Sequence, residues 1–174
     1  MLVLGVDPGS RVSGYGLVEK KNDQMTCIRA GTISLPGKIP FYERIYKIFH
    51  SMAGIITHYH PQELAIEDIF FAKNVKSALK LGHARGAVLI AAAQSGIKIF
   101  EYTPLEIKKS VVGYGRATKE QVRSMVKIIL KLKTQPALDA SDALATAICH
   151  LNWIRYDSTP ERHSIKKDNP VRDY

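Results

Sequence analysis

Four carboxylic acids occur where the sequence predicts that a strand ends or a helix begins. Asp7 follows the apolar, β-forming run of residues 2–6, and Glu67 follows a second short apolar run at residues 64–66. Asp139 and Asp142 open the last predicted helix, three residues apart and therefore on one face of it. A carboxylate at the end of a central strand lies at one edge of the sheet, where it can meet acids from other elements.

Singly, each acid has an ordinary structural explanation. Asp7 precedes a Pro-Gly pair and can simply begin a turn, because proline presets φ and glycine accepts a positive φ. Asp139 and Asp142 can bond the free amides of a helix N-terminus and complement its dipole. Glu67 can be solvated at a strand end. Taken one at a time, these structural explanations are favoured.

Taken together, the four acids indicate metal chemistry on a phosphodiester. Residues 139–147, Asp-Ala-Ser-Asp-Ala-Leu-Ala-Thr-Ala, surround two of the acids with small side chains and leave a shallow, approachable site. Clustered carboxylates repel one another unless a cation neutralises them. Oxygen ligands at an open site suit Mg²⁺ or Mn²⁺. Two such ions, about 3.5–4 Å apart, would clamp the attacking and leaving oxygens of a phosphodiester displacement.

The charge distribution favours a polyanionic partner. The 174-residue chain carries a formal net charge of +9. Residues 72–133 hold 13 Lys and Arg against 3 Asp and Glu, so one region contains the whole excess. Such a footprint is typical of a nucleic-acid-binding surface, although a merely solvated basic surface stays open. Acids beside a basic region therefore predict a metal-dependent nuclease.

The hydrophobic pattern predicts one α/β domain that positions these acids. Apolar runs bounded by turn residues predict strands near residues 2–6, 10–19, 25–35, 64–67 and 96–100. Helical spacing and capping patterns predict helices near residues 41–59, 74–94, 104–112, 118–129 and 139–153. Three strands in hairpin order, followed by alternating helices and strands, imply a mixed five-stranded sheet with helices on both faces over residues 1–156. The polar tail, residues 157–174, is expected to be flexible.

The chain shows no sign of secretion or membrane insertion. Cys27 and Cys149 are isolated, with neither metal-ligand spacing nor a disulfide framework, which favours a reducing compartment. The N-terminus lacks the basic segment of a signal peptide, and the longest apolar run, residues 86–93, is too short to span a bilayer. We therefore expect a cytoplasmic protein.

Five motifs follow one another along residues 1–153. They are Leu4-Gly-Val-Asp-Pro-Gly-Ser-Arg-Val-Ser-Gly-Tyr-Gly16, Ala65-Ile-Glu67, the segment 72–86, Val111-Val-Gly-Tyr-Gly-Arg116 and Asp139-Ala-Ser-Asp-Ala-Leu-Ala145. Together they resemble the RuvC family of bacterial Holliday-junction resolvases. The resemblance implies a ribonuclease H-like fold, a homodimer, and symmetric, metal-dependent nicking of two opposing strands of a four-way DNA junction in recombination and repair. The nicks are expected to leave 5′-phosphate and 3′-hydroxyl ends.

The resemblance assigns a catalytic and metal-binding quartet to Asp7, Glu67, Asp139 and Asp142. It implies Mg²⁺ as cofactor, two ions per site, with Mn²⁺ as a substitute, and we expect Asp7 to bridge both ions. Some relatives carry His at the position of Asp139, and many carry Gln at the position of Asp68. A branch-migration motor of the RuvA and RuvB type is the implied partner.

The resemblance also implies contacts with DNA. Phe70 matches the aromatic residue that stacks on bases at the junction centre, and Lys108 and Lys119 match basic residues close to the scissile phosphate. Lys108, beside Lys109, can equally lie on a solvated helix face. For Lys119 a contact with DNA is favoured, because Lys119 and Arg123 begin a basic stripe with a four-residue repeat. The further candidate DNA contacts are Lys73, Lys76, Lys80, Arg85, Arg116 and Arg123.

Gly82 and Gly86 lie four residues apart in an Ala-rich predicted helix. They permit close contact with another helix, either in a dimer interface or inside one subunit. Both explanations stay open.

Two other functions compete with the nuclease. An Asp-x-Gly-Ser start also opens actin-like ATP-binding lobes, but 174 residues leave no room for the second lobe that those proteins need. A junction-binding protein without activity is the second competitor, and metal-dependent nicking discriminates it from a nuclease.

Overall fold

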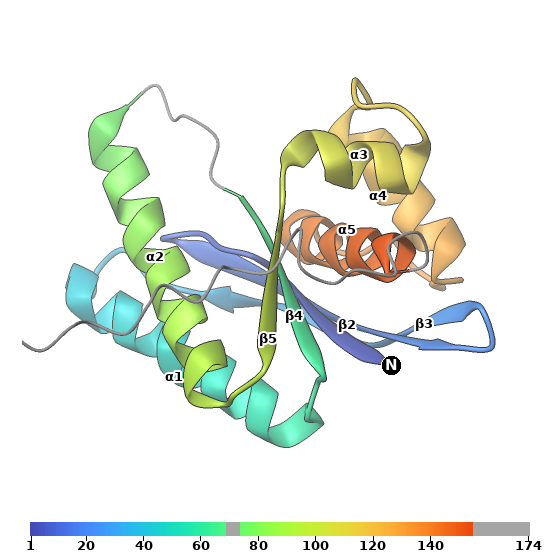
Figure 1. The fold of residues 1–174 in the computed structure, drawn as a ribbon. Helices are drawn as coiled ribbons and strands as arrows, with labels where there is room; N and C mark the ends of the chain where they lie inside the picture. The colour runs from blue at the N-terminus through green and yellow to red at the C-terminus, as the bar shows by residue number, and fades with distance from the viewer. Residues whose placement is uncertain (69–73, 155–174) are drawn as a thin grey trace, which may run out of the picture.

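A computed structural model describes residues 1–68 and 74–154 of the chain (Figure 1). The predicted DNA contacts Phe70 and Lys73 and the predicted tail, residues 157–174, lie outside the described residues. The strands are β1 Leu2–Asp7, β2 Val12–Lys21, β3 Gln24–Ser34, β4 Glu63–Glu67 and β5 Lys98–Tyr102. The helices are α1 Phe41–Tyr59, α2 Val75–Gln94, α3 Pro104–Val112, α4 Lys119–Ile129 and α5 Leu138–Trp153.

The sheet has the strand order β3-β2-β1-β4-β5, with antiparallel hairpins on one side of β1 and parallel strands on the other. β1 pairs antiparallel with β2, and β2 pairs antiparallel with β3. β1 and β4, and then β4 and β5, run parallel, and their connections pass through α1 and α2. Parallel neighbours need such crossover helices, whereas antiparallel ones need only tight turns. The predicted mixed five-stranded sheet is therefore confirmed.

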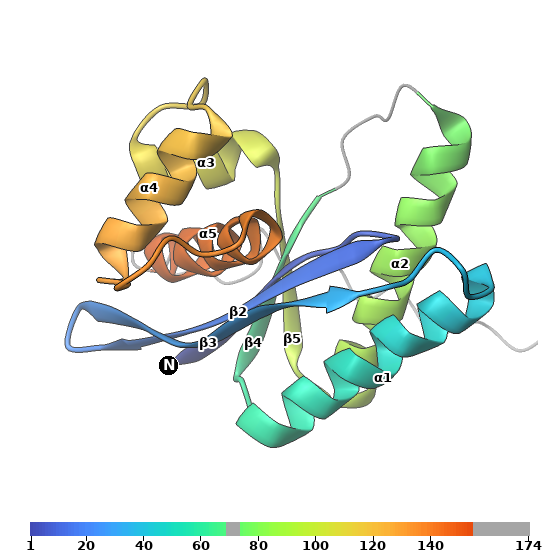
Figure 2. The same ribbon diagram turned by 180° about the vertical axis from the view of Figure 1, so that it is seen from behind.

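Helices cover both faces of this sheet, as predicted. α1 and α2 pack on one face, whereas α5 packs on the other with α3 and α4 stacked on its outer side (Figures 1 and 2). Successive side chains of a strand point to opposite faces. In β1, Leu4 and Val6 accordingly pack in the hydrophobic core between the sheet and the helices α1 and α2, called the α1–α2 core. Val3 packs in the core between the sheet and α5. Gly5 and Asp7 follow Val3 on the α5 side.

Most predicted elements are confirmed to within a residue or two. The helix expected over residues 74–94 begins after its Asn74 cap, and the capping box predicted at Thr118 and Gln121 is present. The last strand is shifted from the predicted residues 96–100 to Lys98–Tyr102. Gly96 has a φ of +70° and belongs to the turn that follows α2, so the strand begins two residues later. In the described part of the chain, no helix combines the length and the apolar character needed to cross a bilayer.

The backbone of α5 lies directly against the β1–β2 hairpin, because glycines leave no side chain between them. A Cβ atom at Gly5 would stand 2.1 Å from the Ala143 carbonyl oxygen. A Cβ atom at Gly14 would stand 2.0 Å from the Asp139 carbonyl oxygen. Since Gly14 is the register partner of Asp7, this contact holds the first turn of α5 beside the end of β1.

We expect Gly5→Ala to destabilise the fold by about 2–3 kcal/mol, because the added methyl group meets main-chain atoms that cannot rotate away. Gly54→Ala is the matched control, since Gly54 is exposed in α1 and an added Cβ there meets no atom of residues 1–68 and 74–154 within 4 Å. That change should be neutral or stabilise by up to about 1 kcal/mol. Urea denaturation measures both. A Gly5→Ala variant as stable as the wild type would contradict the close approach of α5.

Candidate active site

Asp7 and Glu67 meet because β1 and β4 are parallel neighbours. Val6 and Ile66 are register partners, so the residues that end the two strands lie side by side at the carboxyl edge of the sheet. Val6 and Ile66 are buried in the α1–α2 core, and strand alternation therefore turns the next side chain of each strand toward α5. The two acids thus face the same helix.

α5 brings Asp139 and Asp142 to this edge. The helix follows Ala137 as its N-cap residue, and no side-chain hydrogen bond caps it. Asp142 is instead bonded to a lysine of α4. The explanation of these acids as hydrogen-bonding helix caps is therefore wrong. Both acids act electrostatically on Asp7, so the tertiary structure gathers all four predicted carboxylates.

Two of the acids, Asp7 and Glu67, are buried enough and close enough to other carboxylates to disfavour their own ionisation. The pKa of Asp7 is raised from 3.8 to about 7, chiefly by burial and then by the charges of Glu67 and Asp142, with a smaller effect of Asp139. The pKa of Glu67 is also raised, by burial first and by Asp142 second. Acids that repel one another in a buried site are stabilised when a cation enters it.

Two lysines border the acids. The Lys119 ammonium group donates a 2.9 Å hydrogen bond to the Asp142 carboxylate, and this bond is the main cause of the raised pKa of Lys119. Lys119 is the first residue of α4, directly after the Thr118 cap. Lys108 of α3 lowers the pKa of Glu67, and the two lysines line one small cavity with Glu67 and Asp142. The lysines that were predicted near the scissile phosphate therefore lie beside the acids.

The carboxylate oxygens of the four acids suit a hard divalent cation, although they do not converge on one point in this structure. Within residues 1–68 and 74–154, no three Asp, Glu, His or Cys side chains converge in a way that holds a metal ion as they stand. The Lys119 ammonium group supplies the positive charge beside Asp142 instead. To hold a divalent cation here, the carboxylate side chains would have to rotate toward one another.

Arg85 does not fit the predicted contact with DNA. Its side chain is only 9% exposed. The guanidinium group donates hydrogen bonds to the Glu67 carbonyl oxygen and to the Glu101 carboxylate. Because a buried and paired guanidinium group is not available to a phosphate, this prediction is corrected: Arg85 is paired inside the protein.

The remaining predicted DNA contacts lie outside the acidic cluster. The guanidinium group of Arg123 already has one partner within the protein, because its Nε donates a 2.7 Å hydrogen bond to the Pro136 carbonyl oxygen. Exposed or half-exposed side chains are found at Lys76, Lys80 and Arg116. All of these contacts stay predictions, as do those of Phe70 and Lys73.

Gly5 and Gly14 were not among the predicted site residues, although the contact that they permit positions two of the acids. A sequence signal for them exists. In Gly5-Val-Asp7 and Gly14-Tyr-Gly16, glycine alternates with larger residues, so two paired strands carry small residues on the face that bears an acid. A strand glycine often marks the close approach of another backbone.

We expect Asp7→Asn to stabilise the metal-free protein at pH 8. The pKa of Asp7 rises from 3.8 to about 7 on folding, so its ionised form costs stability above pH 7, and this cost disappears as the pH falls toward 4. The gain at pH 8 should reach up to about 4 kcal/mol, at about 1.4 kcal/mol per pKa unit. Urea denaturation in EDTA at pH 8 and pH 4 measures it. A variant less stable than the wild type at pH 8 would contradict the repulsion.

Comparisons with known proteins show the family of this chain. The family model for "Crossover junction endodeoxyribonuclease RuvC" matches residues 3–150. A protein of that name from Magnetococcus marinus is 47% identical over 150 residues, which cover 86% of this chain and 83% of the relative. Its counterpart from Trichlorobacter lovleyi is 43% identical over 176 residues, which cover 100% of this chain and 99% of the relative.

Solved structures give the same result. T. thermophilus RuvC in complex with Holliday junction substrate is similar at a TM-score of 0.86 and 34% identity, covering 90% of this chain and 96% of that one. The yeast mitochondrial Holliday junction resolvase Ydc2 shares the fold, with a TM-score of 0.64 at 11% identity over 87% of this chain and 78% of its own. Because the family model spans most of the sequence and these bacterial relatives match nearly all of it, the chain belongs to the RuvC family of crossover junction endodeoxyribonucleases.

Proposed function

We propose that this protein resolves four-way DNA junctions in recombination and repair by nicking two opposing strands symmetrically. The nicks leave 5′-phosphate and 3′-hydroxyl ends, and residues 1–156 form the single nuclease domain. The observation that carries the proposal is the gathering of four carboxylates, contributed by β1, β4 and α5, at one edge of the sheet beside Lys119. Family membership supports the substrate, since the T. thermophilus relative was solved in complex with a Holliday junction substrate.

Mg²⁺ is the proposed cofactor, with two ions per site and Mn²⁺ as a substitute. Asp7, Glu67, Asp139 and Asp142 are the proposed ligands. Asp7 interacts with all three other acids, so we assign it to both ions. When bound, the ions supply a more acidic water for the attack and stabilise the departing 3′ oxygen. The contribution of the chain is to hold these carboxylates on two strands and a helix that meet at one edge.

Lys119 has two successive partners in this proposal. In the metal-free arrangement its ammonium group neutralises Asp142. Once Asp142 turns toward a cation, the same group is released, and its side chain is 66% exposed. It can then contact an oxygen of the scissile phosphate and stabilise the negative charge that grows there. Lys108, which lines the same cavity, is the second proposed phosphate contact.

The proposed DNA surface continues outward from these lysines. Its contacts position the phosphate backbone, so affinity for a junction should fall steeply with salt. The proposed residues are Lys76 and Lys80 on α2, Arg116, Lys119 and Arg123 at and before α4, Lys108 on α3, and Phe70 and Lys73 in the segment before α2.

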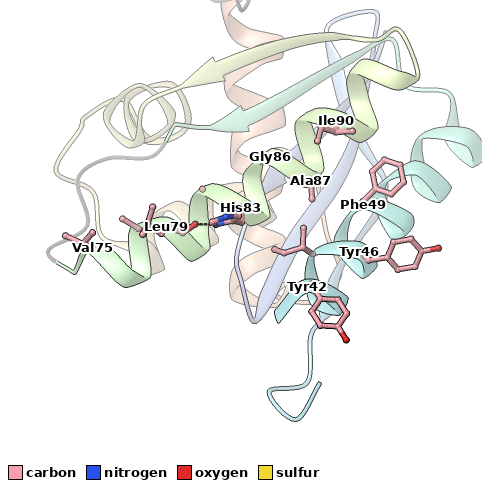
Figure 3. A pocket seen from close by; sticks show the side chains of 12 residues that line it. Tyr42, Tyr46, Phe49, Val75, Leu79, His83, Gly86, Ala87 and Ile90 are labelled. Atoms are coloured by element: carbon pink, nitrogen blue, oxygen red, sulfur yellow. Dashed lines mark hydrogen bonds between the residues drawn. The ribbon is translucent and has the colours of Figure 1, made fainter. Parts of the chain in front are cut away.

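A second copy of the chain is the proposed occupant of an apolar groove between α1 and α2. The groove has a volume of about 1170 Å³. Figure 3 shows aromatic side chains of α1 and aliphatic side chains of α2 along it. Exposed apolar surface of this extent marks an interaction site in a protein that is otherwise charged. The side chains that line it include Tyr42, Tyr46 and Phe49 of α1 and Val75, Leu79 and Ile90 of α2.

Gly82 and Gly86 favour a dimer over packing inside one subunit. Both glycines line the groove. Among the described residues, a Cβ atom added at either position meets no atom within 4 Å, so neither glycine serves a close contact within that part of the chain. A helix of a second copy that approaches α2 across the groove gives both glycines a function, and a self-complementary patch of this kind is what a two-fold dimer requires.

Family membership also bears on the alternatives that the sequence left open. It supports a cytoplasmic location and a branch-migration motor of the RuvA and RuvB type as partner, and it opposes an actin-like ATP-binding lobe. The junction-binding protein without activity is opposed by the presence of all four acids, and the following experiment tests it directly.

We expect the protein with Mg²⁺ to nick a synthetic immobile four-way junction at symmetric positions and to leave a matched linear duplex intact. Asp7→Asn should reduce nicking about 1,000-fold or more, as expected for a member of a catalytic unit. Junction binding should be spared, because the change removes no phosphate contact. End-labelled strands on denaturing gels measure nicking, and mobility shift in EDTA measures binding.

Two outcomes would count against this proposal. Tight binding without nicking, across Mg²⁺, Mn²⁺ and several junction sequences, would assign the protein to the class of non-catalytic junction-binding proteins. Joint loss of binding and nicking in Asp7→Asn would remove the catalytic role of Asp7.

We expect Leu79→Glu to convert the dimer to a monomer, because a carboxylate buried in an apolar interface without a partner is costly. Leu79 is 59% exposed in the groove of a single chain. Ile128→Glu is the matched control, since Ile128 is similarly exposed but lies on α4, outside the groove. Light scattering over a range of protein concentrations measures the mass. A dimer that survives Leu79→Glu, or that dissociates equally with Ile128→Glu, would refute this interface.

A further inference from the structure

Arg85 is a charged residue in an unusual place. It belongs to α2, where its neighbours Ala84, Ala87 and Val88 are buried in the core between the helix and the sheet. Arg85 itself is 7% exposed. Arginine is seldom buried unless its guanidinium group is fully paired, so the partners of this group show what its burial achieves.

The guanidinium group joins three elements at the catalytic edge. Its Nη1 donates a 2.5 Å hydrogen bond to the main-chain carbonyl oxygen of Glu67, the last residue of β4. Its Nη2 donates to the carboxylate of Glu101 in β5 and lies 4.0 Å from an Asp68 carboxylate oxygen. α2 is thereby tied to the ends of both β4 and β5.

We propose that Arg85 is a positioning residue for nicking, because it fixes the main chain of Glu67 and so the direction of the Glu67 carboxylate. The proposal rests on the proposed function, in which Glu67 works with Asp7. A hydrogen bond to the carbonyl oxygen of Glu67 orients the peptide plane that follows its Cα. The side chain on the same Cα then points toward α5 in one defined direction.

The chemistry of the site explains why this residue is an arginine. Its planar fork reaches the Glu67 carbonyl oxygen with one nitrogen and the Glu101 carboxylate with the other. Lysine offers one compact ammonium group and cannot hold both acceptors in this geometry. The same guanidinium group is also the cation that Asp68 and Glu101 share.

The test compares Arg85→Lys with Glu101→Gln. Arg85→Lys keeps the positive charge and removes the fork, whereas Glu101→Gln removes the ion pair and keeps the hydrogen bond from Arg85 to the Glu67 carbonyl oxygen. A misplacement of about 1 Å costs about 100-fold in rate, so Arg85→Lys should lower the nicking rate at saturating protein about 10- to 100-fold. Junction affinity in EDTA should be unchanged, and Glu101→Gln should nick as the wild type does.

Mn²⁺ calorimetry separates this proposal from the proposed function. Arg85→Lys should weaken Mn²⁺ binding to the protein alone, and Glu101→Gln should not. If the wild type nicks no junction, the proposed function fails, but the Mn²⁺ affinities still test Arg85. Wild-type nicking and Mn²⁺ affinity in Arg85→Lys, or equal losses in both variants, would overturn the positioning role.

A measurement on the wild type guards against a variant that does not fold. In a Mg²⁺ titration followed by nuclear magnetic resonance, the guanidinium ¹⁵N signals of Arg85 should shift with the same midpoint as the side-chain carboxyl signal of Glu67. Arg85 signals that stay fixed while the Glu67 carboxyl signal moves would overturn the proposal.

Discussion

The contact between the backbone of α5 and the β1–β2 hairpin is the constraint on which the site depends. It exists because Gly5 and Gly14 present no side chain to the helix. Since α5 begins at the edge where β1 ends, its first two turns bring Asp139 and Asp142 close to Asp7. A larger residue in the hairpin would move the helix outward and, with it, half of the carboxylates. The gathering of the acids at this edge therefore follows from backbone packing as much as from the acids themselves.

Gathering these acids opposes folding in the absence of a cation. Burial and like charge raise the pKa of Asp7 to about 7, and the protein meets part of the repulsion with the ammonium group of Lys119 on Asp142. The same lysine stands where a phosphate is proposed to bind. In the metal-free arrangement, Lys119 thus supplies the positive charge beside Asp142 that a bound cation is proposed to supply during the reaction.

α2 connects the apolar groove with the edge of the sheet that bears the acids. On one side of α2, Gly82 and Gly86 line the apolar groove. On another side, Arg85 donates a hydrogen bond to the main chain at the end of β4. The surface proposed for a dimer and the residue proposed to position Glu67 thereby lie on one helix. In this arrangement the buried guanidinium group links the surface proposed for a second copy to the main chain of Glu67.

The sequence by itself determined the elements and the four acids, because periodicity, caps and turns depend on residues close together in the chain. Only the tertiary structure decided which groups meet. The parallel pairing of β1 with β4 and the contact of α5 with glycines join residues far apart in sequence. Arg85 shows the same limit: it follows Lys80 by five residues, which turns it about 140° round the helix at 3.6 residues per turn. Lys80 is half-exposed while Arg85 is buried against acceptors on two strands, and no local pattern indicates such acceptors.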